Sequence, residues 1–192
     1  MEKRKTDHRV RLTKQIIRES LVPLMKKYPV SRISVKMLCE NAGINRSTFY
    51  THYAGVYDLL YQIQRECINE LSVIISDDAF SEQTKRTVQA LEQILSYAKA
   101  NSELFEVLLS ENGDFAFQRE IMLLAQQKII HEIQSMKNID PGILEYLQFF
   151  IVNGVLSVVQ KWLSTGMKEP VPEMAAFCST LLYNGLSGFS VR

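Results

Sequence analysis

The segment from Ser34 to Tyr53 constrains the fold of this 192-residue chain more than any other part. Ser34 is a favourable N-cap, and apolar residues follow it at the spacing of a buried helix face. Gly43 should end this helix, because glycine adopts the left-handed conformation without a steric penalty. Asn45 is the next N-cap, and residues 46–52 predict about two further helical turns. Two short helices joined by a glycine-containing turn are typical of a helix-turn-helix, whose second helix enters the major groove of DNA.

The rest of the chain has a helical pattern almost throughout. It holds only 5 prolines and 8 glycines, and no segment alternates polar and apolar residues as a strand does. We therefore predict an all-α fold of about nine helices. Residues 1–54 should form a three-helix DNA-binding domain. Its first helix should begin near Thr13, lose a hydrogen bond or kink at Pro23, and end at Pro29. Residues 55–192 should form a helical effector-binding and dimerisation domain.

Charge is unevenly divided along the chain. Residues 1–53 carry 12 Lys+Arg and 4 Asp+Glu, a net charge of +8, whereas residues 54–192 carry 10 and 17, a net charge of −7. A basic end on an otherwise acidic protein is the electrostatic footprint of a nucleic-acid-binding module. A solvated basic surface with no partner is the alternative interpretation.

Several other functions are disfavoured by the sequence. No apolar run follows the basic N-terminus, so no signal peptide is expected, and the most apolar stretch, residues 146–163, is interrupted by polar residues and predicts no membrane span. Cys39, Cys67 and Cys178 are far apart in helical apolar patterns, which favours buried free thiols and a cytoplasmic location. Motifs for metal binding, nucleophilic catalysis and phosphate binding are missing, so we predict no enzyme activity, no metal site and no cofactor.

The apolar stretch at residues 146–163 has almost no polar face. Such a helix must be covered on several sides. We expect helices at about 141–164 and 172–186 to pair with the same two helices of a second chain, forming an intersubunit four-helix bundle. A monomer with a large core is the alternative. A homodimer would place two recognition helices about 34 Å apart, which suits a palindromic DNA site.

The chain resembles the TetR/AcrR family of transcriptional regulators. The resemblance covers residues 10–60 and rests on Ser34-Val35, Ala42-Gly43-Ile44, the segment from Arg46 to Tyr53, and Tyr57-Asp58-Leu59-Leu60. In the C-terminal part, the segment from Asn112 to Phe115 and the spacing of Gly154, Trp162 and Gly166 are similar to a domain found in a Gram-positive bacterial subgroup.

This resemblance implies a homodimeric repressor that binds a palindromic operator in double-stranded DNA. An effector bound in the C-terminal domain would tilt the fourth helix and release the operator. One position departs from the family pattern, because Val56 stands where many members carry a phosphate-binding lysine. We therefore expect weaker phosphate anchoring at that point.

Residues of the first three helices are predicted to contact DNA. Arg46 either reads a guanine or contacts a phosphate, and both interpretations stay open. Phe49 and Tyr53 are expected in the core. Arg4, Lys5, Arg9 and Arg11 are expected to form a flexible basic arm that follows the DNA backbone, enters the minor groove or is solvated. The predicted DNA-contacting residues are Thr13, Ser34, Lys36, Asn45, Arg46, Ser47, Thr48, Tyr50, Thr51 and His52.

The effector site is less evident in the sequence. Aromatic residues can line a pocket between helices, although at helical spacing they also fill cores, and an asparagine in an apolar helix needs a polar partner. The effector candidates are Tyr97, Phe105, Phe115, Tyr146, Phe150 and Asn153. The effector is either a small molecule or a partner protein, and activation of transcription is an alternative to repression.

Overall fold

The computed structural model describes the backbone of residues 2–75, 84–110, 113–135 and 141–187, and the side chains of residues 8–75, 87–110, 113–127 and 142–182. Over these residues the fold is all-helical, with nine α-helices, one short 3₁₀ helix and no strand. The predicted fold class is confirmed. The chain divides into two compact units, which are Met1–Cys67 with Val107–Asp114, and Ile68–Glu106 with Phe115–Arg192. Helix α4 belongs to both units, and the predicted domain boundary at residue 54 stays a prediction.

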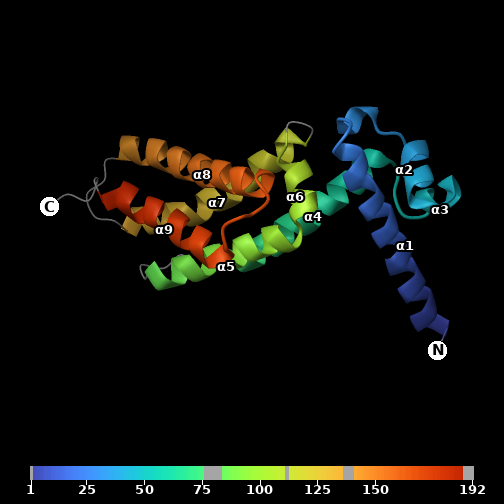
Figure 1. The fold of residues 1–192 in the computed structure, drawn as a ribbon, viewed down its shortest axis with the longest axis horizontal. Coiled ribbons are helices and arrows are strands. Elements are labelled where there is room, and N and C mark those ends of the chain that lie inside the picture. Colours follow the sequence, from blue (N-terminus) through green and yellow to red (C-terminus); the bar gives the residue numbers. More distant parts are fainter. Residues whose placement is uncertain (1, 76–83, 111–112, 136–140, 188–192) are drawn as a thin grey trace. The chain divides into compact units, whose positions relative to one another are not determined.

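The first unit contains the N-terminal helices (Figure 1). They are α1 (Glu2–Met25), the 3₁₀ helix η1 (Val30–Arg32), α2 (Val35–Ala42), α3 (Arg46–Tyr50) and the first part of α4 (Val56–Ile74). Helix α2 packs against both α1 and α3. The core of this unit is formed by apolar side chains from α1, α2, α3 and α4, including Ile17, Leu21, Leu38, Phe49 and Leu59.

Helix α1 begins well before its predicted start. The prediction that Thr13 caps it is wrong, since the helix begins at Glu2 and the Thr13 hydroxyl donates to the Arg9 carbonyl oxygen at 2.9 Å. The residues before Thr13 are mostly basic or apolar with good helix propensity, so an existing helix extends through them at little cost. The segment predicted as a flexible arm is therefore helical. Pro23 lies inside α1 on its exposed side, where the Glu19 carbonyl oxygen that loses its amide partner can be hydrated.

The second unit is a bundle of longer helices (Figure 1). It contains α5 (Thr84–Ala100), most of α6 (Ser102–Leu108), α7 (Phe115–Ser135), α8 (Pro141–Ser164) and α9 (Val171–Ser187). Helix α9 packs on α5, and α8 packs on both α7 and α9. Pro141 opens α8 as predicted, and Gly166, at φ +84°, follows its end.

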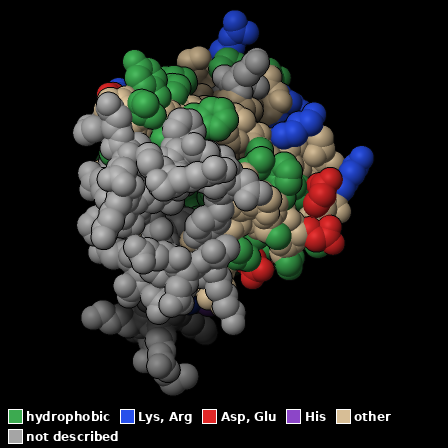
Figure 2. Space-filling model, turned by 90° about the vertical axis from the view of Figure 1, so that its left-hand side faces the viewer, with side chains coloured by type: hydrophobic (Ala, Val, Ile, Leu, Met, Phe, Trp, Pro, Cys, Tyr) green, Lys and Arg blue, Asp and Glu red, His purple; other side chains and the backbone are tan. Residues whose placement is uncertain are grey.

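Helix α8 is apolar but only partly covered in the single chain. Over Gly142–Ser164 it is long and apolar enough to cross a membrane by length and composition, and only 17% of that window is buried. Tyr146 is 79% exposed and Phe150 is 73% exposed. Hydrophobic side chains also reach the surface on the face drawn in Figure 2. The core of one chain therefore leaves one side of α8 uncovered.

Candidate DNA-binding site

The turn between α2 and α3 has the geometry predicted for a helix-turn-helix. The Ser34 hydroxyl accepts a hydrogen bond from the Met37 backbone N–H at 3.2 Å and so caps α2. Gly43 ends α2 in the left-handed conformation, with φ 66° and ψ 32°, and its N–H donates to the Cys39 carbonyl oxygen. The Ile44 N–H donates to the same carbonyl at 3.0 Å. These two bonds satisfy the Cys39 carbonyl oxygen in the last turn of α2 and fix the direction in which α3 starts.

Helix α3 is shorter than predicted. It ends at Tyr50, and residues 51–52 form a turn in which the N–H groups of His52 and Tyr53 both donate to the Phe49 carbonyl oxygen, at 2.9 and 3.0 Å. Such shared bonds tighten the last turn of a helix. Phe49 has no exposed surface and Tyr53 is buried, so both face the core as the sequence indicates.

Burial of Phe49 leaves the other side of α3 in solvent. Arg46, Ser47, Tyr50 and Thr51 are exposed, whereas Thr48 and His52 are half-buried. Asn45 occupies the N-cap position, but its side chain makes no capping hydrogen bond and is exposed. The face opposite Phe49 therefore carries the polar groups that base edges and phosphates require.

Two hydroxyls on this surface have defined hydrogen bonds. The Thr51 hydroxyl donates to the Ser47 carbonyl at 2.9 Å, so its oxygen can only accept from a further partner. Ser34 accepts from Met37, so its proton is free to be donated to a phosphate oxygen.

Lys36 lies in the first turn of α2, close to Ser34. Its ammonium pairs with Glu40 at 3.7 Å, and both side chains are about two-thirds exposed, at 64%. An exposed pair of this kind contributes little to stability. Lys36 can therefore exchange Glu40 for a DNA phosphate at small cost.

The beginning of α4 differs from the arrangement that the resemblance implies. Val56 is 7% exposed and lies in the core, whereas the next residue, Tyr57, is exposed. The Asp58 carboxylate accepts a hydrogen bond from the Ala54 backbone N–H at 2.8 Å, which closes the N-terminal turn of α4. Position 56 thus contributes apolar packing rather than a charge.

Two titratable groups of the first unit are affected by the packing. Burial raises the pKa of the Tyr53 phenol, with Arg18 opposing the shift and Glu66 and Asp58 adding to it. Burial also raises the pKa of the Cys39 thiol, and the nearby Arg46 guanidinium opposes that shift. Both groups therefore stay neutral at neutral pH.

The six effector candidates have different surroundings in the structure. Tyr97 and Phe105 contact each other, with ring centroids 5.6 Å apart in an edge-to-face arrangement. Phe115, Tyr146 and Phe150 are exposed. The Asn153 amide donates to the Phe149 carbonyl oxygen of its own helix at 2.7 Å, so the polar partner that it needs is local.

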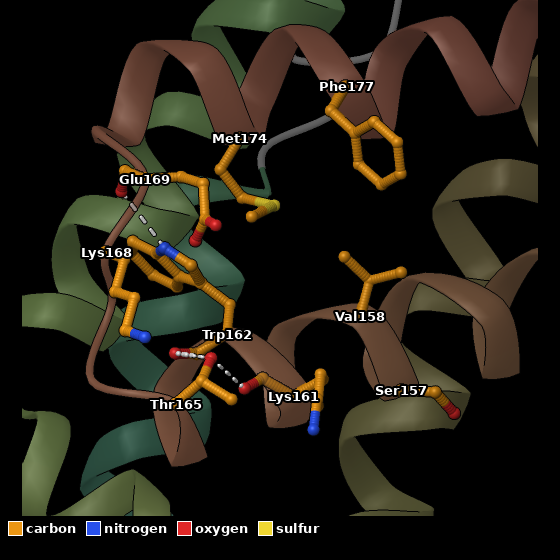
Figure 3. A pocket seen from close by; sticks show the side chains of 9 residues that line it. All are labelled: Ser157, Val158, Lys161, Trp162, Thr165, Lys168, Glu169, Met174 and Phe177. Atoms are coloured by element: carbon orange, nitrogen blue, oxygen red, sulfur yellow. Dashed lines mark hydrogen bonds between the residues drawn. The ribbon is translucent and has the colours of Figure 1, made fainter.

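A cleft that the sequence did not predict lies between α8, α9 and the connection between them (Figure 3). Its volume is about 560 Å³. The Trp162 indole N–H donates to the Glu169 carbonyl oxygen at 3.1 Å, which holds the connection against the end of α8. The nine lining residues combine an apolar floor with two lysines and one glutamate: Ser157, Val158, Lys161, Trp162, Thr165, Lys168, Glu169, Met174 and Phe177. Sequence reasoning missed this cleft because it depends on the path of the α8–α9 connection, although Lys161 and Lys168 close to Trp162 were visible.

Comparison with known proteins defines the family. Residues 85–184 match the family model of a transcriptional regulator C-terminal region, TetR_C_8. The chain belongs to the TetR family of transcriptional regulators. It is also 30% identical over 141 residues, 68% of its length, to the uncharacterized HTH-type transcriptional regulator YxbF of Bacillus subtilis (strain 168). The matched region spans 36% of the length of YxbF.

Solved structures of TetR-family regulators share the fold. A TetR transcriptional regulator from Streptococcus agalactiae 2603V is 19% identical with a TM-score of 0.64, over 92% of this chain and 97% of that one. The dihydroxyacetone kinase operon activator DhaS is 17% identical with a TM-score of 0.62, over 93% and 98%. FadR from Bacillus subtilis, solved with stearoyl-CoA, is 14% identical with a TM-score of 0.66, over 89% and 98%. This TetR-family chain is accordingly a regulator and not an enzyme, as the sequence predicts.

Proposed function

We propose that the first unit binds double-stranded operator DNA through α3. The observation that carries this proposal is the contrast between the two sides of α3, since Phe49 has no exposed surface while Arg46, Ser47 and Tyr50 are exposed. Arg46 and Ser47 begin the helix, and N-terminal residues of a recognition helix usually reach the base edges. In this proposal, the other predicted residues contact phosphates or bases next to those read by Arg46 and Ser47. They are Thr13, Ser34, Lys36, Asn45, Thr48, Tyr50, Thr51 and His52.

Selection from a randomised DNA library tests the proposal. The full chain should enrich a palindrome, and the affinity for that palindrome should fall steeply as salt rises, because basic side chains release counterions from DNA. If no sequence were enriched at any salt concentration, the proposal would be wrong. A cytoplasmic location is part of the same proposal, because the operator is there.

We also propose that the protein acts as a homodimer through α8 and α9. Uncovered aromatic side chains on α8, Tyr146 and Phe150 among them, support this interface. Phe177 and Leu181 of the neighbouring helix α9 are also exposed apolar side chains. A second chain would cover these side chains in an intersubunit bundle and would set the separation of two recognition helices.

The effector is proposed to act as a small molecule that lowers operator affinity, which makes the protein a repressor. The cleft between α8 and α9 is one place where such a molecule could bind, and the six aromatic and polar candidates are another. Both involve the second unit, and a ligand in the cleft would touch both helices of the proposed interface. Soaking or co-crystallising the protein with cell extract, followed by inspection of the cleft for bound density, separates the two locations.

Activation of transcription is the second candidate function. It is favoured by the similarity in fold to DhaS, which is described as an operon activator. A protein effector would fit this alternative, because the exposed apolar surface of the second unit could take a partner protein. Transcription from the selected operator in vitro, with and without the protein, distinguishes repression from activation.

A further inference from the structure

The N-terminal half of α1 is a basic helix whose described side chains are exposed or half-buried. None of residues 8–16 is buried, and the first buried side chain of α1 is Ile17. Val10 and Leu12 are among the exposed apolar residues. Residues 2–16 carry 6 Lys+Arg and 2 Asp+Glu, a net charge of +4. At 1.5 Å per residue this segment is about 22 Å long.

We infer that this helical extension binds the phosphate backbone of DNA flanking the operator, through the side of α1 that carries Arg9. The inference rests on the proposed operator binding by α3. The partner is identified by charge, since a segment with a net charge of +4 complements a polyanion. The extension also belongs to the same compact unit as α3, so both can meet one DNA molecule.

Helical structure decides which part of DNA the extension can reach. An α-helix with its side chains is about 10–12 Å wide, whereas the minor groove is about 6 Å wide. An extended arm could enter that groove, but a helix cannot. The major groove does admit a helix, but α3 occupies it in the proposed complex. We therefore assign the basic side chains of the extension to phosphate oxygens, a contact without base preference.

The face of α1 that meets DNA follows from the packing of α2. Ser20 is buried, and its carbonyl oxygen accepts a hydrogen bond from the Asn41 amide of α2 at 2.9 Å. Arg9 and Thr13 lie 11 and 7 residues before Ser20, which places all three on one side of the helix. Arg11 is two residues from Arg9 and so lies about 200° around the helix. Arg9 therefore lies on the side occupied by α2, and Arg11 on the opposite side.

This arrangement gives a matched pair of variants. Arg9→Gln and Arg11→Gln remove the same charge from exposed positions two residues apart. Affinity for the selected operator is measured by fluorescence anisotropy between 50 and 300 mM salt. One lost phosphate contact should make the slope of log K against log salt shallower by about 0.9. We expect that change for Arg9→Gln and the wild-type slope for Arg11→Gln.

DNA length supplies a second measurement. An extension of about 22 Å spans about six base pairs at 3.4 Å each. Lengthening both flanks of a minimal operator by six base pairs should strengthen binding by the wild type and by Arg11→Gln, and less so by Arg9→Gln. The added sequence should not matter.

Two results overturn the inference. Equal changes in both variants would indicate a general effect of charge, and unchanged slopes in both would show that the extension does not touch DNA. In either case operator binding through α3 would persist, whereas failure of the proposed function would show as no enriched operator for the wild type. Circular dichroism and urea unfolding should be the same for both variants and the wild type, which excludes misfolding as the cause.

Discussion

The side-chain amide of Asn41 donates to the backbone carbonyl oxygen of Ser20 at 2.9 Å and joins α2 to α1. Asn41 lies at the C-terminal end of α2, just before the turn that leads to α3. The bond therefore fixes the end of α2 from which the recognition helix starts. It is a contact between side chain and backbone across 21 positions of sequence, so helical periodicity does not predict it.

Asn41→Ala should destabilise the first unit. Loss of a hydrogen bond of this type costs about 1 kcal/mol in the free energy of unfolding. Asn69→Ala is the matched control, because Asn69 is an exposed helical asparagine of α4 and its replacement includes the same change in helix propensity. Urea unfolding should give a free energy lower for the first variant than for the second by about that amount. Equal values would mean that the contact contributes nothing.

Gly43→Ala should also destabilise the chain. Gly43 has φ +66°, and nothing lies within 4 Å of a Cβ atom built there, so backbone strain is the whole cost. The left-handed conformation costs an alanine about 1–2 kcal/mol. Gly55 has equally open surroundings but no positive φ, so Gly55→Ala should change the free energy of unfolding by no more than about 0.5 kcal/mol. A similar loss in both variants would contradict this account.

The helix-turn-helix was predictable because its constraints are local. The Ser34 cap, the left-handed Gly43 and the buried Phe49 depend on residues within one or two turns of each other. The start of α1 was not predictable in this way, because threonine is a favourable N-cap residue like serine. Only the structure shows that the helix continues before Thr13 and that its hydroxyl donates to the Arg9 carbonyl oxygen instead. The cleft between α8 and α9 was not predicted either. It depends on the hydrogen bond from Trp162 to the α8–α9 connection, and helical periodicity does not predict such a contact.

Arg46 and Lys36 should contribute differently to DNA binding. Arg46 begins α3, and its replacement by alanine should relax base preference in the selected sequences, because a bidentate contact to guanine gives about 1–3 kcal/mol of discrimination. Lys36→Ala should weaken binding to all sequences about equally and reduce the salt dependence. Repeating the library selection with each variant measures both effects. Unchanged base preference for Arg46→Ala would leave Arg46 as a phosphate contact.

Stability should fall at alkaline pH partly because of Tyr53. Burial raises the pKa of this phenol above its ordinary value of 10.0, so the folded state keeps the proton to higher pH than the unfolded state. The contribution to stability is fully present below pH 10.0 and is lost as pH rises through the folded-state pKa.

Tyr53→Phe should therefore reduce the loss of stability above pH 10. Urea midpoints at pH 8 and pH 11 measure it, with Tyr57→Phe as the control for losing an exposed phenol of the same unit. Cys39 and Cys178, whose thiol pKa values are also raised by burial, remain in both variants and contribute equally to each. The same pH dependence in both variants would assign the alkaline loss to other groups.

The apolar side of α8 should determine the oligomeric state. Phe150 is 73% exposed in the single chain, and a charge at this position would have to be buried in the proposed bundle. Phe150→Asp should convert a dimer into a monomer in sedimentation velocity, and it should weaken operator binding because two linked recognition helices bind one palindrome. Val73 of α4 is 74% exposed and makes the matched control, since Val73→Asp adds the same charge outside α8 and α9. A dimer that survives Phe150→Asp, or one that dissociates equally with Val73→Asp, would place the interface elsewhere. A wild-type chain that is monomeric and partitions into lipid vesicles through α8 would instead explain the uncovered apolar helix by membrane contact.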